Sequence, residues 1–440
     1  MEVLWWLKLS VTLRNFMSHS QILIIGAGAA GLLAARELSL AGKAVVVLEG
    51  GARTGGRVLD VENPGWPIPV SLGAEFIHGD LPLSFDLLKE AGMTYTPMDQ
   101  RGVRIRDGKE IAEERTGHWT EFMDRLNTLE ADVALSDFLA SFFSDSRYAA
   151  LRGEVLRFAE GYDAADPDTV SVFSLRDEWS DDGVQYRVDG GYGRLINFLV
   201  SRCDELGCSI LLHKVVTRIR WQKGFVEVIT SNGESFTADK LIVTIPPGVL
   251  RIPSGNAGSI AFEPALPEQD RAFGAIGFGA VIKIVIGFKS AFWADTLSPD
   301  TNFLFSEETV PTWWLHSPNT TPILYGWIAG PQATKMDSCT DKKVMEKTIT
   351  ALALTFGLTE DFLNEQIEEF YLFNWNTNPF SKGGYAFMTL EGREAVDVLR
   401  AGVQDTIYFA GEAIYKGPHG GTVEAAFVSG REAARKILDN

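Results

Sequence analysis

The sequence predicts an α/β fold in which one parallel sheet draws strands from both ends of the chain, with an α+β part between them. Three observations carry this prediction. Near the N-terminus, the apolar residues 22–25 run into a glycine-rich turn, and near the C-terminus the apolar residues 407–410 run into Gly411 and Glu412. Between them, Lys283 interrupts the apolar run 280–286. Apolar runs of this length are typical of strands buried on both faces.

The glycine-rich turn has the pattern of a dinucleotide-binding strand, turn and helix. Gly26 permits the tight turn, Gly28 lets the backbone approach a diphosphate, and Gly31 lets the next helix pack closely on the sheet. We expect that helix over residues 29–40. Its first N–H groups, at Ala29 and Ala30, face the diphosphate, because a helix N-terminus carries partial positive charge.

The residues after the helix strengthen this interpretation. Glu49 ends the next apolar strand, at the position where a carboxylate hydrogen-bonds a ribose hydroxyl. Arg53, Gly56 and Arg57 follow, and they offer positive charge and small residues beside the cofactor phosphates. Together these features predict a Rossmann-like domain.

The C-terminal segment favours FAD over NAD. A strand ending at Ala410 delivers Gly411 and Glu412 to the carboxyl edge of the sheet, and a helix over residues 423–438 points its N-terminus back at the site. That helix N-terminus suits the negative charge that a reduced flavin gathers on its pyrimidine side.

The intervening chain predicts two domains, of which the first is discontinuous. Residues 81–158 are expected to be mainly helical, residues 225–236 to form a hairpin around Asn232-Gly233, and residues 341–355 to form a helix. The cofactor-binding domain takes residues 18–80, 190–250 and 395–440. The substrate-binding domain takes residues 81–189 and 251–394, and residues 1–17 are an N-terminal extension in which Met17 is a plausible start.

Composition narrows the class of protein. The chain has 440 residues, of which 45% are hydrophobic, so it can bury a large core. Its net charge of −18 argues against nucleic acid and anionic membranes as partners. Residues 1–17 are too short to span a bilayer and lack a signal-peptide pattern, which predicts a cytoplasmic protein. The cysteines match no redox pair or metal spacing, so no metal site is expected and the three are read as inert buried thiols, at Cys203, Cys208 and Cys339.

From about Ser18 to Asn440, the chain resembles the flavin-containing amine oxidases. That family includes the monoamine oxidases, the polyamine oxidases and the flavin histone demethylases. The motifs that carry the resemblance follow the order of the chain: residues 26–31, Glu49, 55–57, 73–79, 281–283, Trp375, 381–385, 409–412 and 421–426. The resemblance implies a glutathione-reductase-like FAD domain beside an α+β substrate domain. Covalent members attach FAD to a cysteine just before the cage tyrosine. Gly384 stands there, so FAD is expected to be held without a covalent bond.

The resemblance also assigns roles to residues. The lysine that matches Lys283 holds a water at flavin N5 and aids reaction with O2, although from the residues alone Lys283 could face outward on a half-exposed strand. Tyr385 matches one wall of an aromatic cage around the substrate nitrogen. Thr422 stands where monoamine oxidases have a second tyrosine, and this departure favours the polyamine oxidase and histone demethylase branch. His78 matches a polar residue near the substrate entrance, where a plain surface histidine is the rival interpretation.

The remaining residues implied by resemblance would contact the cofactor. Trp375 packs along the flavin, with a simple core position as the alternative, and Val216 contacts the adenine part through its backbone. Gly50 and Gly51 replace the usual Ala-Arg after Glu49, so one phosphate or ribose contact is expected to be missing. The other expected cofactor contacts are Gly73, Ala74, Gly421 and Val423.

These features predict an FAD-dependent amine oxidase. The expected reaction transfers hydride from the carbon next to a small-molecule amine, a polyamine or similar compound, to the flavin, and O2 then regenerates the flavin with release of H2O2. An L-amino-acid oxidase remains an alternative, since Arg101, Arg104 or Arg106 could bind a carboxylate. A desaturase or porphyrinogen oxidase and a non-catalytic flavin-bound scaffold that recognises amines are further alternatives. The sequence leaves the particular amine and the oligomeric state open.

Overall fold

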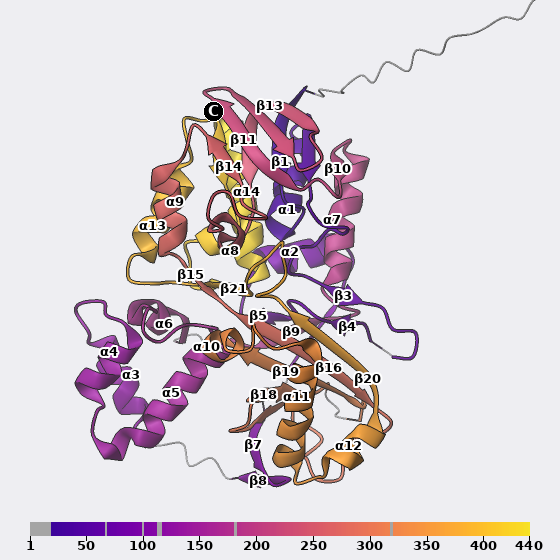
Figure 1. The fold of residues 1–440 in the computed structure, drawn as a ribbon, viewed down its shortest axis with the longest axis vertical. Helices are drawn as coiled ribbons and strands as arrows, with labels where there is room; N and C mark the ends of the chain where they lie inside the picture. The colour runs from indigo at the N-terminus through magenta and orange to yellow at the C-terminus, as the bar shows by residue number, and fades with distance from the viewer. Residues whose placement is uncertain (1–18, 67, 99–100, 112–116, 180–182, 317–319) are drawn as a thin grey trace, which may run out of the picture.

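The computed structural model describes residues 19–66, 68–98, 101–111, 117–179, 183–316 and 320–440. Two large sheets organise these residues, one in the upper and one in the lower half of Figure 1, and a helical lobe lies to one side of the lower sheet. The predicted extension at residues 1–17 lies outside the described residues.

The upper sheet has eight strands, which include β1 near the N-terminus and β22 near the C-terminus. Its order is β10-β2-β1-β13-β12-β11-β14, and β22 pairs with β13. Strands β10, β2, β1, β13 and β22 run parallel, whereas β12 is antiparallel to both neighbours. The strands are β1 (His19–Ile25), β2 (Val45–Leu48), β10 (Ser209–Leu211), β11 (Val216–Gln222), β12 (Phe225–Thr230), β13 (Ser235–Val243), β14 (Ala261–Glu263) and β22 (Ile407–Phe409).

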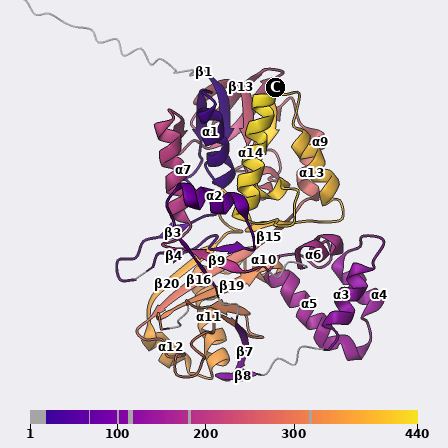
Figure 2. The same cartoon turned by 180° about the vertical axis from the view of Figure 1, so that it is seen from behind.

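Helices cover both faces of this sheet, so β1 is buried on both sides. Ile22 and Ile24 belong to one core cluster, whereas Leu23 and Ile25 belong to another. On the first face lie α1 (Ala29–Leu40), α2 (Pro82–Glu90), α7 (Gly193–Glu205) and α14 (Val423–Asp439), and Figure 2 shows α1 and α14 side by side. On the second face lie α8 (Pro247–Leu250), α9 (Pro267–Ala275) and α13 (Gly392–Ala401).

The lower sheet carries the lysine strand. Its order is β20-β16-β19-β18-β17-β7-β8. The strands are β7 (Gly102–Arg106), β8 (Lys109–Ile111), β16 (Val281–Phe288), β17 (Phe303–Phe305), β18 (Thr312–Trp314), β19 (Ile323–Ala329) and β20 (Ile367–Asn374). Helices α10 (Gly330–Thr334), α11 (Asp341–Phe356) and α12 (Glu360–Gln366) lie between β19 and β20 along the chain. All eight residues of β16 are buried, because β19 and β20 flank it and side chains cover both faces.

Small sheets and a lobe complete the fold. The small sheets pair β3 (Asp60–Val61) with β4 (Val70–Ser71), β9 (Gln185–Val188) with β5 (Phe76–His78) and β6 (Tyr95–Pro97), and β15 (Gly277–Gly279) with β21 (Tyr385–Phe387). The lobe has a core of its own, built around Phe122, Phe138 and Leu151. The helices of the lobe are α3 (Trp119–Asn127), α4 (Leu135–Phe142), α5 (Ala149–Gly161) and α6 (Val172–Trp179), and the 3₁₀ turn η1 (Ser146–Tyr148) precedes α5. A second 3₁₀ turn, η2 (Glu412–Ile414), follows β22.

Most of the local predictions are confirmed. The helix predicted over residues 29–40 is α1, the hairpin is β12 and β13 with Gly233 at a φ of 80°, and the C-terminal helix is α14. The helical prediction for residues 81–158 is confirmed for α2, α3, α4 and α5, but it misses the strands β6, β7 and β8. The apolar alternation of Val103 and Ile105 marks β7, where both side chains are buried. Strand β14 joins the upper sheet, although the sequence assigned residues after 250 to the substrate-binding part.

Among the described helices, none combines the length and the apolar composition needed to cross a membrane.

Candidate active site

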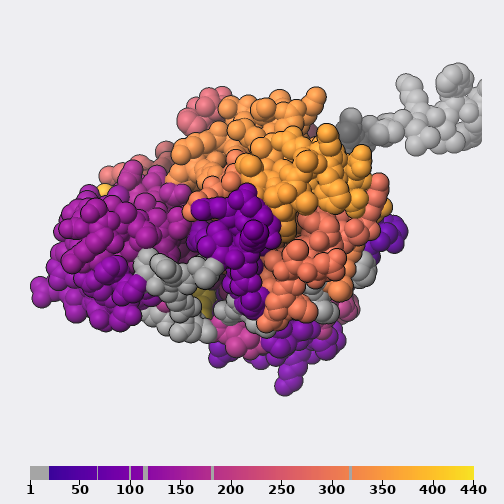
Figure 3. Space-filling view, turned by 90° about the horizontal axis from the view of Figure 1, so that it is seen from below, coloured from indigo at the N-terminus to yellow at the C-terminus, as the bar shows by residue number. Residues whose placement is uncertain are grey.

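A cavity of about 1930 Å³ runs between the upper sheet, the lower sheet and the helical lobe. Seen from below, the molecule is hollowed between the magenta lobe and the purple β7–β8 hairpin (Figure 3). The glycine turn after β1 lines one part of the cavity, whereas Lys283, Tyr385 and residues of α5 and α6 line another. One continuous space therefore joins the predicted cofactor site to the predicted substrate site.

The glycine turn leaves room and hydrogen-bond donors for a diphosphate. Gly26 has a φ of 106°, which favours glycine, and a Cβ at Gly31 would lie 2.0 Å from the Gly26 carbonyl oxygen. A Cβ at Gly28 would meet only Gly56 Cα, at 3.9 Å, so this surface is open. No side chain caps α1, which leaves the N–H groups at its start available to a ligand.

Glu49 and Arg53 brace the loop that follows β2. The Glu49 carboxylate accepts hydrogen bonds from the N–H groups of Ala27 and Gly51, both at 2.8 Å, which fixes its orientation at the strand end. The Arg53 guanidinium donates to the carbonyls of Thr54, Gly56 and Val58. The ribose contact of Glu49 and the phosphate contact of Arg53 stay predictions. The carbonyl contacts give Arg53 a loop-bracing role as well.

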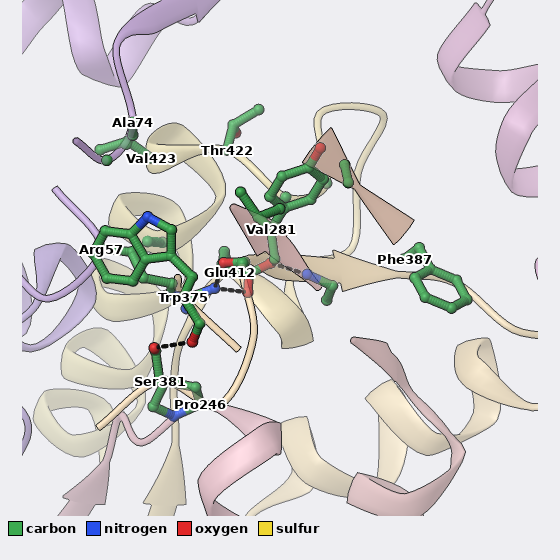
Figure 4. A pocket seen from close by; sticks show the side chains of 18 of the residues that line it. Arg57, Ala74, Pro246, Val281, Trp375, Ser381, Phe387, Glu412, Thr422 and Val423 are labelled. Atoms are coloured by element: carbon green, nitrogen blue, oxygen red, sulfur yellow. Dashed lines mark hydrogen bonds and ion pairs between the residues drawn. The ribbon is translucent and has the colours of Figure 1, made fainter. Parts of the chain in front are cut away.

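Arg57 joins three distant segments of the chain at the cavity wall. Its guanidinium donates to a Glu412 carboxylate oxygen at 2.6 Å and to the Gly384 carbonyl at 2.8 Å. The other Glu412 oxygen accepts from the Ala386 N–H, and Figure 4 shows Arg57 and Glu412 beside Trp375. This ion pair therefore holds the N-terminal loop, the C-terminal strand end and the Tyr385 segment in one wall.

The remaining predicted cofactor residues lie around the same cavity. Trp375 is buried, its indole N–H donates to the Leu72 carbonyl at 2.9 Å, and its own carbonyl accepts from Ser381 (Figure 4). Gly31 does not line the cavity and acts through packing, as predicted. The predicted cofactor residues that do line the cavity are Gly26, Gly28, Ala29, Ala30, Glu49, Arg53, Gly56, Arg57, Gly73, Ala74, Val216, Trp375, Gly411, Glu412, Gly421, Thr422 and Val423.

The residues present fit FAD. The cavity is long enough to be lined by both the α1 and the α14 N-termini, and a Cβ at Gly411 would meet open space. Thr422 caps α14 by accepting from the Ala425 N–H at 3.1 Å, so the helix N-terminus is formed and faces the cavity. When bound, FAD supplies hydride acceptance from substrate and electron transfer to an acceptor.

Gly384 leaves no room for the side chain that a covalent flavin link requires. A Cβ at this position would lie 2.4 Å from Val281 Cγ2, and Val281 is fully packed in β16. We expect G384C to lose about 1–3 kcal/mol of stability through overpacking. It should also release all of its flavin on acid precipitation, as the parent enzyme should. The double variant V281A/G384C removes the contact with Val281 Cγ2 but keeps a second one, because Val281 Cβ would lie 2.8 Å from the new Cβ. It should therefore recover only part of the stability. Flavin that stays with precipitated G384C would contradict this prediction.

Lys283 lies in a buried network of charges. Its ammonium is 1% exposed, and it donates to a Glu75 carboxylate oxygen at 2.8 Å and to the Gly73 carbonyl at 3.0 Å. The outward-facing alternative for Lys283 is therefore wrong, because β19 and β20 enclose its strand. Burial lowers the pKa of Lys283, whereas the Glu75 carboxylate opposes that shift. The sequence identified Lys283 but gave no signal that Glu75 is its partner.

Aromatic rings surround the space next to Lys283. The rings of Tyr385 and Trp327 stack with centroids 6.3 Å apart and planes 17° from parallel. The Tyr385 hydroxyl donates to the carbonyl of Tyr162, whose ring lies edge-on to His78 at 5.6 Å. Burial, with nearby His419, lowers the pKa of His78 to about 4, so this ring is neutral at pH 7. Trp327 and Tyr162 belong to this wall, and the sequence did not identify them.

Two carboxyls that the sequence also missed line the cavity beside the cage. Asp163 is buried, and one of its oxygens accepts from the Trp179 indole N–H at 3.0 Å. Its second hydrogen-bond contact is with the Glu178 carboxyl, with which Asp163 can share a proton. Glu178 lies beside it, and burial raises the pKa of Asp163 and brings that of Glu178 to about 7. Burial raises the pKa of Tyr385, and the charges of Asp163 and Glu178 raise it further.

Comparison with known proteins agrees with this geometry. The sequence pattern described as flavin containing amine oxidoreductase matches residues 29–438. Polyamine oxidase 4 of Oryza sativa subsp. japonica is 28% identical over 461 residues, which cover 96% of this chain and 89% of that protein. Lysine-specific histone demethylase 1B of Mus musculus is 26% identical over 457 residues, and the match covers 95% of this chain but only 53% of that protein.

Solved structures show the same fold. A putrescine oxidase with bound putrescine has a TM-score of 0.79 at 20% identity, over 96% of this chain and 100% of the other. Cyclohexylamine oxidase from Brevibacterium oxydans IH-35A has a TM-score of 0.77 at 20% identity, over 96% of this chain. The predicted α/β fold is thereby confirmed. The chain belongs to the flavin-containing amine oxidoreductase family and is an amine oxidoreductase whose cofactor is FAD.

Proposed function

We propose that this enzyme oxidises the C–N bond of an amine that carries a second positive charge, such as a diamine or polyamine. The observation that carries this proposal is the carboxyl pair of Asp163 and Glu178 in the cavity wall. Ionisation of two adjacent buried carboxyls is costly, and a nearby ammonium group compensates their negative charge. A polyamine offers such a group at one nitrogen while another nitrogen reacts.

The residues of the cage position the reacting nitrogen. The stacked rings of Tyr385 and Trp327 present apolar faces to the cavity, so they exclude water and orient the amine. The reacting amine must be neutral, because its lone pair assists hydride loss from the adjacent carbon. Bound FAD would supply the acceptor for that hydride, and transfer of two electrons and two protons to O2 would then give H2O2. His78 is neutral and adds no charge that would repel a cationic substrate.

The arginines of the alternative amino-acid oxidase do not converge on the cage. Arg101 donates to Glu110 and Thr301, and Arg106 donates to Glu307. Arg104 lines the cavity, but so do the acidic residues Asp163 and Glu178, which disfavour a substrate carboxylate. These contacts support an amine over an amino acid. Use of O2 and a cytoplasmic location stay predictions.

Anaerobic bleaching of the bound flavin tests this function. We expect spermine, spermidine or a short diamine to remove the yellow absorbance at least tenfold faster than an aromatic monoamine or an L-amino acid. The preference corresponds to roughly 1.4 kcal/mol or more from the carboxyl pair. Admission of air should restore the absorbance and release one H2O2 per flavin. If only monoamines or only L-amino acids bleach the flavin, the proposed substrate class is wrong.

A further inference from the structure

Glu75 makes contacts that are unusual for a residue beside a cofactor cavity. It lines the cavity yet is buried, and both carboxylate oxygens are held by strong donors. One oxygen accepts from Lys283 at 2.8 Å and from the Trp314 indole N–H at 3.2 Å. The other forms an ion pair with Arg187, with N–O distances of 2.9 and 3.0 Å. Glu75 is therefore fixed in place, and it fixes Lys283.

Among the residues that the structure describes, the hydrogen bonds of Lys283 use two of its three donors. An ammonium group has three N–H donors, and two of them point at Glu75 and at the Gly73 carbonyl. The ammonium also lies 5.0 and 5.4 Å from the ring centroids of Trp314 and Tyr325, which leaves those sides closed. Lys283 also lines the cavity, so the third N–H is the donor that a ligand in the cavity can use.

The charges around Lys283 explain why it needs Glu75. Arg187 is the second cation in contact with Glu75, and a guanidinium does not lose its proton. His316 donates no further charge, because burial and Arg187 lower its pKa to about 3. Asp60 is a more distant carboxyl, and burial raises its pKa. Without the Glu75 carboxylate, the buried Lys283 and the partly buried Arg187 would repel each other, and Lys283 is the one that can release a proton.

We propose that Glu75 is a positioning residue that holds Lys283 as an ammonium ion and aims its third N–H into the cavity. Glu75 thereby governs how fast the reduced enzyme reacts with O2. A fixed positive charge favours this reaction, because electron transfer to O2 develops negative charge on oxygen. This inference rests on the proposed function only in that FAD lies beside Lys283 and O2 is the acceptor.

Reoxidation of light-reduced enzyme tests this proposal without any amine. Wild-type, E75Q and E75D proteins loaded with FAD are photoreduced without air and mixed with buffered O2 from pH 6 to pH 9. We expect no titration of the wild-type rate in this range. In E75Q the rate at pH 8 should fall at least tenfold and recover as the pH is lowered, since Lys283 regains its proton. E75D keeps the carboxylate and should show the wild-type pH profile.

A second readout needs no turnover. A change in charge at Lys283 shifts the visible absorbance of the oxidised flavin. The absorbance of oxidised E75Q should therefore change with pH, and the midpoint of that change should equal the midpoint of its reoxidation rate profile. In the double variant E75Q/K283R both titrations should disappear, because arginine stays charged. A residue that served only to keep the fold would slow reoxidation equally at all pH values, with no spectral titration.

Three results would overturn the proposal. The first is an E75Q rate that matches the wild type at every pH. The second is a uniform loss of rate without a pH dependence. The third is a wild-type reoxidation rate that changes with pH between pH 6 and pH 9. This result needs only the wild type, so it applies even if E75Q fails to fold. Because light replaces the amine as reductant, failure of amine bleaching and failure of this proposal are distinguishable.

Discussion

The double variant D163N/E178Q is expected to raise the KM for a diamine or polyamine by about 100-fold, which corresponds to roughly 2.7 kcal/mol. The KM for a monoamine should stay within about threefold, because a monoamine has no second ammonium to lose. Steady-state kinetics with one diamine and one monoamine of equal length measure both values. The physical reason is that the amides cannot compensate an ammonium in a cavity where water is excluded.

The same variant should stabilise the protein without substrate. Burial raises the pKa of both carboxyls above their unfolded values, so between about pH 4.5 and about pH 7 the folded state holds more protons than the unfolded state does. Stability therefore falls with rising pH across this window. At pH 8 the double variant should gain on the order of 2 kcal/mol, and its stability should depend less on pH. Thermal unfolding at pH 5 and pH 8 measures this.

Asp177 provides the matched control. It lies next to Glu178 and lines the cavity, but it pairs with Arg393 at 2.9 Å on an exposed part of the surface. D177N removes one negative charge from the same helix and should leave the diamine-to-monoamine ratio unchanged. If D163N/E178Q keeps the wild-type ratio, or D177N alters it as strongly, recognition of a second ammonium by the carboxyl pair is wrong.

Replacing Gly31 by alanine is expected to abolish FAD binding together with the fold of the upper sheet. The new Cβ would lie 2.0 Å from the Gly26 carbonyl oxygen, and neither backbone segment can move without shifting α1 off the sheet. We expect a loss of at least about 3 kcal/mol, the upper range for overpacking. Thermal unfolding of the apoprotein and fluorescence titration with FAD report the two effects separately.

Gly28 is the matched comparison for Gly31. A Cβ there meets only Gly56 Cα, at 3.9 Å, and Gly28 has a φ of −79° that alanine also adopts. G28A should therefore keep the apoprotein within about 1 kcal/mol of wild type. It should nevertheless weaken FAD at least tenfold, because its methyl group fills the place of the diphosphate. Equal unfolding temperatures for apo G31A and apo G28A would contradict the assignment of Gly31 to packing.

Local pattern sufficed for the cofactor-binding elements. The turn from Gly26 to Gly31, helix α1 and helix α14 were predicted with their bounds, because glycine geometry, strand apolarity and helix caps act over a few residues. The mainly helical interpretation of residues 81–158 failed at β7, where the alternation of Val103 and Ile105 is short and pairs with the distant β17.

The charged partners in the site could not be predicted, because they meet over long separations. Glu75 and Lys283 are 208 positions apart, and Arg57 and Glu412 are 355 positions apart. Asp163 and Glu178 are closer in sequence, yet they end up side by side only because α5 and α6 pack within one lobe. Nothing in the pattern of single residues marks such a pair.

The sequence by itself determined the glycine turn with its helix, the lysine strand and the family to which the chain belongs, because each rests on a short motif with its own geometry. Only the tertiary structure decided that Lys283 is buried against Glu75, that Tyr385 faces Trp327 and Tyr162, and that two carboxyls share the substrate cavity. The physical reason is that pKa shifts, cages and ion pairs depend on burial and distance, which arise when separate segments pack together.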